Sequence, residues 1–299
     1  MSLVPAEFSL AIGSTTSPAG REHNEDTILA AAIGQKPGQA YLLAVADGMG
    51  GLEGGEVASS MAISLLGDLF ARDLPADIPL ALKQAYRRAN DAIYREAEAS
   101  GERRQMGTTL VSAVVNGPYV TIANVGDSRA YLLRAKSLTQ ITHDHSVVAE
   151  QIDRGEITPE QARRSSQRNM ITQALGTTPE LDRRMPSIYE FSLLPEDRLL
   201  LCSDGFFDVL QQNDYVSTLL ANNPQDSAIA LADLAIARGT TDNVSAVILE
   251  VGQSLATQQR EQIGAELAAN APKVNPIVLP IILILVLLAV FAIGAWVYL

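Results

Sequence analysis

The chain has 299 residues, is 47% hydrophobic and carries a formal net charge of −12. This length and apolar content allow a sizeable core in one or two domains. So acidic a chain is a poor candidate for a nucleic-acid binder, because the phosphate backbone requires a positively charged surface. The acidic excess has two readings, solubility or the binding of cations by some of the carboxylates, and only the spacing of those carboxylates can separate them.

Residues 1–251 combine strand and helix patterns. Short apolar runs bounded by turn residues predict strands at 8–14, 27–33, 41–46, 109–115, 119–125, 130–133, 188–193, 198–202 and 244–251. The three runs between residues 109 and 133 are joined by the short connections 116–118 and 126–128. We expect connections this short to join antiparallel neighbours.

Apolar residues at helical spacing predict two long helices, near 55–71 and 79–99. The expected core-facing residues of the first helix are Val57, Met61, Leu65 and Leu69. Those of the second helix are Leu82, Ala85, Tyr86, Ala89 and Ile93. Two shorter helices are expected near 214–221 and 224–238. Helices that come in pairs between groups of strands indicate an α+β fold with antiparallel sheets.

Residues 277–299 contain no charged side chain and are mainly Ile, Leu, Val and Ala. About 20 such residues span the hydrocarbon core of a bilayer, and Trp296 and Tyr298 lie at the far end, where aromatic rings favour the interface. We therefore expect one C-terminal transmembrane helix that acts as a tail anchor; the alternative is a buried soluble helix. Arg260 and Lys273 precede the segment and favour a cytoplasmic location for the rest of the chain. Residues 252–276 are expected to form a linker.

Several acidic residues stand at the ends of the expected strands or in turns between them. They are Glu25, Asp26, Asp47, Asp127, Asp204 and Asp242. Asp47 and Asp204 each end an apolar run and are followed directly by glycine, which lets the backbone come close to a bound ion. A single Asp-Gly pair is usually only a turn, but several in one domain favour a shared site.

Carboxylates without accompanying histidine or thiol ligands are the ligand set of hard cations such as Mg²⁺, Mn²⁺ or Ca²⁺. If these side chains converge, their mutual repulsion would be severe without cations. Two ions about 3.5–4 Å apart can bind a bridging water, lower its pKa and stabilise a displacement at phosphorus. Arg21, just before the acidic pair, has the forked guanidinium that matches phosphate oxygens. Taken alone, Arg21 is explained equally well as a surface arginine.

These residues belong to motifs whose order resembles a known family. The motifs are Arg21 with Asn24-Glu25-Asp26, Asp47-Gly48-Met49-Gly50-Gly51, Gly107-Thr108-Thr109, Gly126-Asp127-Ser128-Arg129, Asp144-His145-Ser146, Ala174-Leu175-Gly176, Ser203-Asp204-Gly205 and Thr241-Asp242-Asn243. Together they resemble the metal-dependent protein phosphatases (protein phosphatase 2C, PPM), in their bacterial form, over about residues 8–251. The resemblance implies two stacked antiparallel sheets flanked by helix pairs.

The resemblance also implies roles for the acidic residues. Asp47 would bridge two Mg²⁺ or Mn²⁺ ions, the Gly48 carbonyl would contact one of them, and Asp204 and Asp242 would hold the first. Glu25 would act near the metals through water, and Asp26 would help to fix the second ion. Asp127, with Asp204, would form a weaker third-metal site. Arg21 would bind the substrate phosphate.

Residues 152–169 resemble the family's flap, and carry Arg163, Arg164 and Arg168. Attraction of acidic phosphopeptides and an ordinary solvated helix face are both open readings of these arginines. Some relatives, mainly eukaryotic, have a histidine directly after Asp-Gly as a proposed general acid, whereas this chain has Met49, which cannot donate a proton. His143 and His145 could suggest a metal-ligand pair, but the resemblance favours a structural role in capping a helix that starts near residue 146.

The sequence therefore predicts a metal-dependent phosphatase domain over residues 1–251. It would hydrolyse phosphoserine and phosphothreonine in phosphorylated proteins and oppose a Ser/Thr kinase at a membrane. The alternative is an inactive phosphatase-like module that recruits partners to the membrane; the complete acidic set argues against it. A Mg²⁺-dependent phosphodiesterase or nuclease is disfavoured by the acidic charge. No heptad pattern indicates a dimer, so we expect a monomer.

Overall fold

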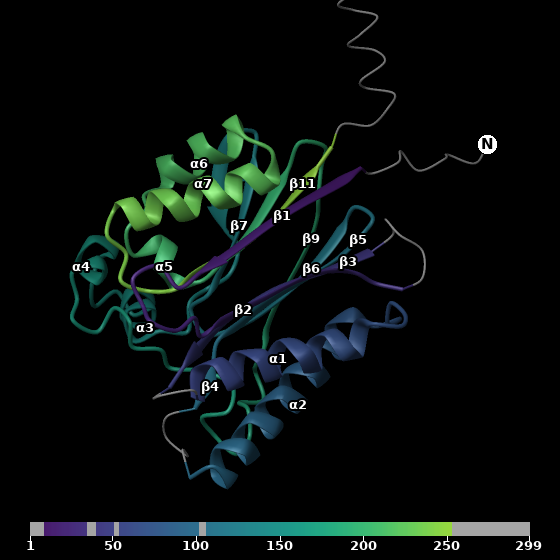
Figure 1. Cartoon of the computed structure of the whole chain (residues 1–299), viewed down its shortest axis with the longest axis vertical. Coiled ribbons are helices and arrows are strands. Elements are labelled where there is room, and N and C mark those ends of the chain that lie inside the picture. Colours follow the sequence, from purple (N-terminus) through teal and green to yellow (C-terminus); the bar gives the residue numbers. More distant parts are fainter. Residues whose placement is uncertain (1–8, 35–39, 51–53, 102–105, 253–299) are drawn as a thin grey trace, which may run out of the picture. The chain divides into compact units, whose positions relative to one another are not determined.

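The computed structural model describes residues 9–34, 40–50, 54–101 and 106–252. Two sheets lie face to face, and helices cover both outer faces (Figure 1). The first sheet has the order β1-β11-β10-β7-β8, from Leu10–Ser17, Val244–Val251, Arg198–Cys202, Arg129–Arg134 and Ser137–Gln140. The second has the order β2-β3-β5-β6-β9, from Asp26–Ala32, Ala40–Met49, Leu110–Asn116, Tyr119–Val125 and Ser187–Ser192. A short strand, β4 (Gly107–Thr108), pairs with the end of β3.

The central strands, such as β3, β5 and β10, are mainly apolar because both of their faces are buried. In β3, Leu43 and Val45 belong to the core between the sheets, whereas Leu42 and Ala44 belong to the core beneath the helices. Successive side chains of a strand point to opposite faces, so one continuous apolar run supplies two cores. All pairings between named strands are antiparallel, which confirms the predicted α+β sandwich of two stacked antiparallel sheets.

Helices α1 (Gly54–Phe70) and α2 (Ile78–Ala99) cover the second sheet (Figure 1). All five residues predicted to form the buried face of α2 are buried. The prediction for α1 was wrong in part: Val57 is 40% exposed, whereas Met61, Leu65 and Leu69 are partly buried and pack against the core. The buried face of α1 consists of Gly54, Gly55, Ala58, Ser59, Ala62, Ile63, Leu66 and Phe70. The most buried stripe, Ala58, Ala62, Leu66 and Phe70, lies one position after the predicted one. Its small residues Ala58 and Ala62 allow close packing, which a search for large apolar residues overlooks.

Helices α5 (Asp204–Phe207), α6 (Gln212–Ala221) and α7 (Pro224–Ala237) cover the first sheet (Figure 1). The last two confirm the predicted shorter helices. The predicted flap falls between β8 and β9, where the chain forms α3 (Val147–Asp153) and α4 (Pro159–Arg163). Figure 1 shows both helices on the same side of the sandwich as α5.

One predicted connection was wrong. Residues 116–118 do join antiparallel neighbours, β5 and β6. Residues 126–128, however, carry the chain from β6 in one sheet to β7 in the other. Gly126 has a φ of +102°, and a Cβ at this position would lie 2.6 Å from the Thr109 side chain. The glycine therefore allows a sharp exit next to β5, and this exit places Asp127 between the sheets' ends.

No helix within the described residues is long and apolar enough to span a membrane. The predicted linker beyond residue 252 and the predicted transmembrane helix at 277–299 lie outside the described residues.

Candidate active site

Two aspartates meet across neighbouring strands. Asp26 is the first residue of β2, and the antiparallel register pairs it with Asp47 near the end of β3. Directly opposed residues of an antiparallel pair project from the same face, and like charges in this arrangement repel each other. The Oγ of Ser203 donates to Asp26 Oδ2 at 2.8 Å, which ties this pair to the segment that carries Asp204.

The backbone around Asp47 is held from both sides. Its N–H donates to Thr109 Oγ1 at 3.1 Å, and its carbonyl accepts from Thr108 Oγ1 at 2.9 Å. At the next residue, a Cβ on Gly48 would collide with the carbonyl oxygens of Gly55 and Glu25. Only glycine fits there, so the backbone of residue 48 can approach the acidic centre closely.

Asp204 and Asp242 come from the other sheet. Asp204 opens α5, directly after β10, and a Cβ on Gly205 would collide with the carbonyl oxygen of Asn243. The turn after β10 therefore packs against the residues that lead into β11. Asp242 lies two residues before β11 begins.

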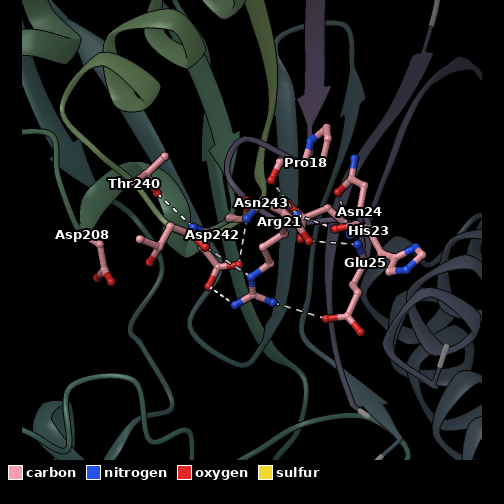
Figure 2. A network of polar contacts seen from close by, with 12 residues as sticks. Pro18, Arg21, His23, Asn24, Glu25, Asp208, Thr240, Asp242 and Asn243 are labelled. Carbon is pink, nitrogen blue, oxygen red and sulfur yellow. Dashed lines mark hydrogen bonds and ion pairs between the residues drawn. The ribbon is translucent and has the colours of Figure 1, made fainter. Parts of the chain in front are cut away.

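Arg21 and Asn243 organise the exposed side of the site (Figure 2). Arg21 donates to Asp242 Oδ2 at 2.7 Å, to Glu25 Oε2 at 3.3 Å and to the carbonyl of Thr241 at 3.4 Å. The Asn243 side chain accepts from the Glu25 N–H at 2.9 Å and donates to the His23 carbonyl at 3.0 Å. The loop before β2 is thereby fastened to the loop before β11.

The electrostatics show that these carboxylates share one region. Burial raises the pKa of Asp47 well above its usual range, and the charges of Asp26, Asp204, Asp127 and Asp242 raise it further. Burial also raises the pKa of Asp26 to about 6, an effect partly offset by hydrogen bonds from Ser245 and Ser203.

Asp127, the residue predicted for the third metal site, also has a raised pKa. Burial and then the charge of Asp144 raise the pKa of Asp127 to about 7, against the opposing effect of Arg129. Burial is the main cause that raises the pKa of Asp204, and the charge of Asp127 raises it further. Protein cations therefore do not neutralise this acidic cluster.

The cluster fits hard divalent cations. Asp26 Oδ1 and Asp204 Oδ1 are buried without a hydrogen-bond partner, and the gathered ligands are oxygens, as Mg²⁺ and Mn²⁺ prefer. No three histidine, cysteine or carboxylate side chains among the described residues lie close enough to hold one ion by themselves. Water and a backbone carbonyl such as that of Gly48 would complete the coordination, in keeping with the waters that Mg²⁺ usually retains.

Sequence reasoning missed two residues beside the cluster. Asp208 follows Asp204 by one helical turn and contributes to the raised pKa of Asp204; the spacing of four residues could have indicated it. Arg129 was quoted only as part of a motif. It donates to both carboxylate oxygens of Asp144, and its guanidinium lies 3.5 Å from the centre of the Phe207 ring.

His145 is structural. His145 Nδ1 accepts from the Gly126 N–H at 3.0 Å, and its Nε2 lies 3.1 Å from Ser187 Oγ. Burial lowers the pKa of His145, so the neutral ring is favoured. Ser146, not a histidine, caps α3, so the predicted capping role was wrong. Cys202 is buried.

Oxygen ligands gathered beside an exposed arginine, at one end of two stacked sheets, are features of metal-dependent phosphate-ester hydrolases. The model of a family described as protein phosphatase 2C matches residues 19–237. The chain therefore belongs to the protein phosphatase 2C family.

Two relatives and one solved structure illustrate the similarity. The serine/threonine protein phosphatase PstP of Mycobacterium tuberculosis is 38% identical over 231 residues, which cover 77% of this chain and 43% of PstP. The serine/threonine phosphatase stp of Listeria monocytogenes is 33% identical over 235 residues, covering 77% of this chain and 91% of that protein. The catalytic domain of PstP in complex with two manganese ions matches with a TM-score of 0.72 and 34% identity, over 82% of this chain and 100% of that chain. This chain thus spans less than half the length of PstP.

Proposed function

We propose that this chain is a metal-dependent protein phosphatase that hydrolyses phosphoserine and phosphothreonine in proteins. The observation that carries the proposal is the convergence of Asp26, Asp47, Asp127, Asp204 and Asp242, with buried carboxylate oxygens that lack partners. The names of the relatives and the two manganese ions of PstP support the same reading. The retained acidic set disfavours an inactive binding module.

Asp47, the Gly48 carbonyl, Asp204 and Asp242 would hold two Mg²⁺ or Mn²⁺ ions. Glu25 and Asp26 would support them, and Asp127 would belong to a third site. Bound ions of this kind lower the pKa of a water towards neutrality and offset charge on the phosphate oxygens. The chain's own contribution is to hold the carboxylates in place through the Thr108, Thr109 and Ser203 hydroxyls.

Arg21 would bind the phosphate group of the substrate. Three of its five guanidinium N–H groups donate to Thr241, Glu25 and Asp242 within the described chain, which leaves two for phosphate oxygens. Because Glu25 and Asp242 orient the planar fork, less freedom is lost when a phosphate binds. The side chain is 42% exposed, so substrate can reach it.

The leaving hydroxyl requires a proton that Met49 cannot give. His145 uses both ring nitrogens within the fold, and His143 pairs with Asp153 at 3.0 Å. Figure 2 shows the His23 ring directed away from the Arg21 guanidinium. We infer that water protonates the leaving group.

The test is phosphate release from phosphothreonine and phosphoserine peptides by the full-length chain. We expect turnover with Mn²⁺ or Mg²⁺, none with EDTA, and loss of activity in Asp47→Asn. Asp91→Asn, on the exposed face of α2, is the matched control and should retain full activity. An active Asp47→Asn variant would refute the two-metal assignment, and a folded wild-type chain that binds Mn²⁺ but never turns over would favour the inactive module.

We propose also that residues 277–299 anchor the protein in a membrane, with the catalytic domain in the cytoplasm, where it opposes a Ser/Thr kinase. The support is the uncharged apolar run and the basic residues before it. Deletion of 277–299 should move the protein from the membrane to the soluble fraction after cell lysis. A truncated chain that stays with the membrane would contradict the anchor.

A further inference from the structure

The turn that carries Asp127 is contacted by a loop from further along the chain. The turn, residues 126–128, leads from β6 to β7, and the loop, residues 142–146, lies between β8 and α3. Asp127 in the turn and His145 in the loop are both buried. The contacts between the two segments therefore decide where the Asp127 carboxylate lies.

His145 binds both backbone groups of Gly126. The Gly126 N–H donates to His145 Nδ1 at 3.0 Å, and the Gly126 carbonyl accepts from the His145 N–H, also at 3.0 Å. Asn124 Nδ2 adds a longer hydrogen bond to the same carbonyl, at 3.3 Å. Because Gly126 directly precedes Asp127, the orientation of its planar peptide group sets the direction in which Asp127 begins.

The ring of His145 can accept from Gly126 in only one tautomer. A backbone N–H is always a donor, so Nδ1 carries no proton and the proton of the neutral ring lies on Nε2. Nε2 then donates to Ser187 Oγ at 3.1 Å, at the start of β9. The hydroxyl of Ser187 thereby supports the tautomer that holds Gly126.

The loop around His145 is itself fixed on both sides. Asp144 accepts from Arg129 Nε at 3.0 Å and from Arg129 Nη2 at 2.6 Å. The His145 carbonyl accepts from the Thr172 N–H at 2.8 Å. Because the backbone of His145 is held in this way, its ring can fix Gly126 and does not simply follow it.

The turn needs such an outside contact. Gly126 has a φ of +102°, and glycine has more backbone freedom than any other residue. After burial, the charge of Asp127 is the next cause that raises the pKa of Asp204, so Asp127 faces the acidic cluster from this turn. A cation site requires its ligands to be held to within about 0.5 Å, which a free glycine turn does not provide.

We propose that His145 is a positioning residue: by accepting from the Gly126 N–H through Nδ1, it holds the turn in the shape in which Asp127 binds a third divalent cation. The inference rests on the proposed phosphatase function, and it adds a residue outside the predicted ligand set. His145 acts through Gly126 and is not a metal ligand.

Two substitutions of similar polarity separate this role from general support of the fold. The side-chain oxygen of asparagine lies on the γ-carbon, as Nδ1 does, so His145→Asn keeps the acceptor for Gly126. In His145→Gln the polar atoms lie one carbon further out, so this variant reaches Ser187 but loses that acceptor. His143→Gln is the matched control, since the His143 side chain is 52% exposed and pairs with Asp153.

The test is a Mn²⁺ titration of the full-length chain, in which the electron paramagnetic resonance signal of free Mn²⁺ counts the bound ions without any turnover. Asp127→Ala identifies the step that belongs to the third ion. His145→Gln should weaken that step by about 10- to 100-fold and leave the first two ions unchanged. His145→Asn and His143→Gln should bind all three ions like the wild-type chain.

Turnover gives a second readout. With p-nitrophenyl phosphate, His145→Gln should lose activity at limiting Mn²⁺ and regain it as Mn²⁺ is raised, because a displaced ligand lowers the affinity for the ion and leaves the chemistry intact. His145→Asn should need no extra Mn²⁺. A loss of activity in both variants that Mn²⁺ does not restore would overturn the proposal.

The outcomes separate this proposal from the phosphatase function. Equal third-ion affinities in the Gln and Asn variants would overturn the positioning role, as would an equal weakening of all three ions in His145→Gln. A wild-type chain that turns over with only two ions would overturn it too and leave the phosphatase function standing. A chain that binds Mn²⁺ but never turns over would refute the phosphatase function, and the ion affinities would still decide the role of His145.

A measurement on the wild-type chain decides the case in which His145→Gln does not fold. The long-range ¹H–¹⁵N spectrum of a ¹⁵N-histidine-labelled chain reports which ring nitrogen carries the proton. We expect the His145 proton on Nε2. A proton on Nδ1 would overturn the proposal, because Nδ1 could then accept nothing from Gly126.

Discussion

Replacing Asp127 with asparagine should stabilise the fold when no divalent cation is bound. Asp127 is buried, and its pKa rises from 3.8 to about 7. The difference corresponds to at most about 4 kcal/mol of unfolding free energy. Asparagine has nearly the same shape but no charge, so we expect Asp127→Asn to be about 1–4 kcal/mol more stable than the wild-type chain at pH 8 in EDTA.

The pH dependence has a definite sign. Below about pH 4 residue 127 is protonated in both the folded and the unfolded chain, so it makes no difference to stability. Between pH 4 and pH 7 the unfolded chain loses the proton while the folded chain keeps it. The stability of the wild-type chain relative to Asp127→Asn therefore falls across this range and stays low above it.

The assay is urea unfolding of the full-length chain at several pH values, followed by far-UV circular dichroism. Tryptophan fluorescence is unsuitable, because the single tryptophan, Trp296, lies outside the described domain. Saturating Mn²⁺ should reverse the order, because a cation that binds only the folded wild-type site adds stability. Asp91→Asn is the control and should change stability by less than about 0.5 kcal/mol. If Asp127→Asn is less stable than wild type in EDTA at pH 8, the reasoning is refuted.

Three further predictions concern the site and its support. Arg21→Lys should raise KM for phosphopeptides more than it lowers kcat, because lysine keeps the charge but loses the fork; equal effects on both constants would argue against phosphate binding. Asp127→Ala should lower turnover at saturating Mn²⁺ more than it lowers the affinity for the first two ions, and unchanged turnover would reject a catalytic third site. Tyr86→Phe should cost about 1–3 kcal/mol in urea unfolding, since the buried hydroxyl donates to the Ala123 carbonyl at 2.8 Å and pairs with Ser112 at 2.9 Å; activity should persist, and unchanged stability would contradict this role.

Strands buried on both faces were the most predictable elements. The ranges predicted for β6, β10 and β11 agree with the structure to the residue. Each is a mainly apolar run followed by a glycine or a polar residue, so local signals coincide with burial. Cys202 lies within β10, and burial raises the pKa of its thiol to about 12.

Features that depend on distant partners were not predictable from local patterns. The turn at Asp127 looks like a hairpin, but β7 pairs with β10 and β8 instead of β6. The buried face of α1 is set by close packing of small residues such as Ala58 and Ala62, which a count of large apolar residues overlooks. The short helix α5 begins with the Asp204-Gly205 pair, which taken locally indicates only a turn.

The candidate site, too, was predictable only in part from the sequence. The residue types and the glycines indicated hard-cation chemistry, but the roles of the individual aspartates came only from the family resemblance and stay predictions. Their convergence requires the cross-strand register of Asp26 with Asp47 and the packing of Gly205 on Asn243. Both are contacts between residues far apart in the chain, and no spacing along the sequence encodes them.

The central claim is that Asp47 holds two divalent cations. An anomalous difference map from a crystal grown with Mn²⁺, collected at the manganese absorption edge, tests it most directly. We expect two peaks, about 3.5–4 Å apart, on either side of the Asp47 carboxylate, with Asp204 and Asp242 beside one of them. A map with Mn²⁺ bound elsewhere, or with no peak next to Asp47, would contradict it.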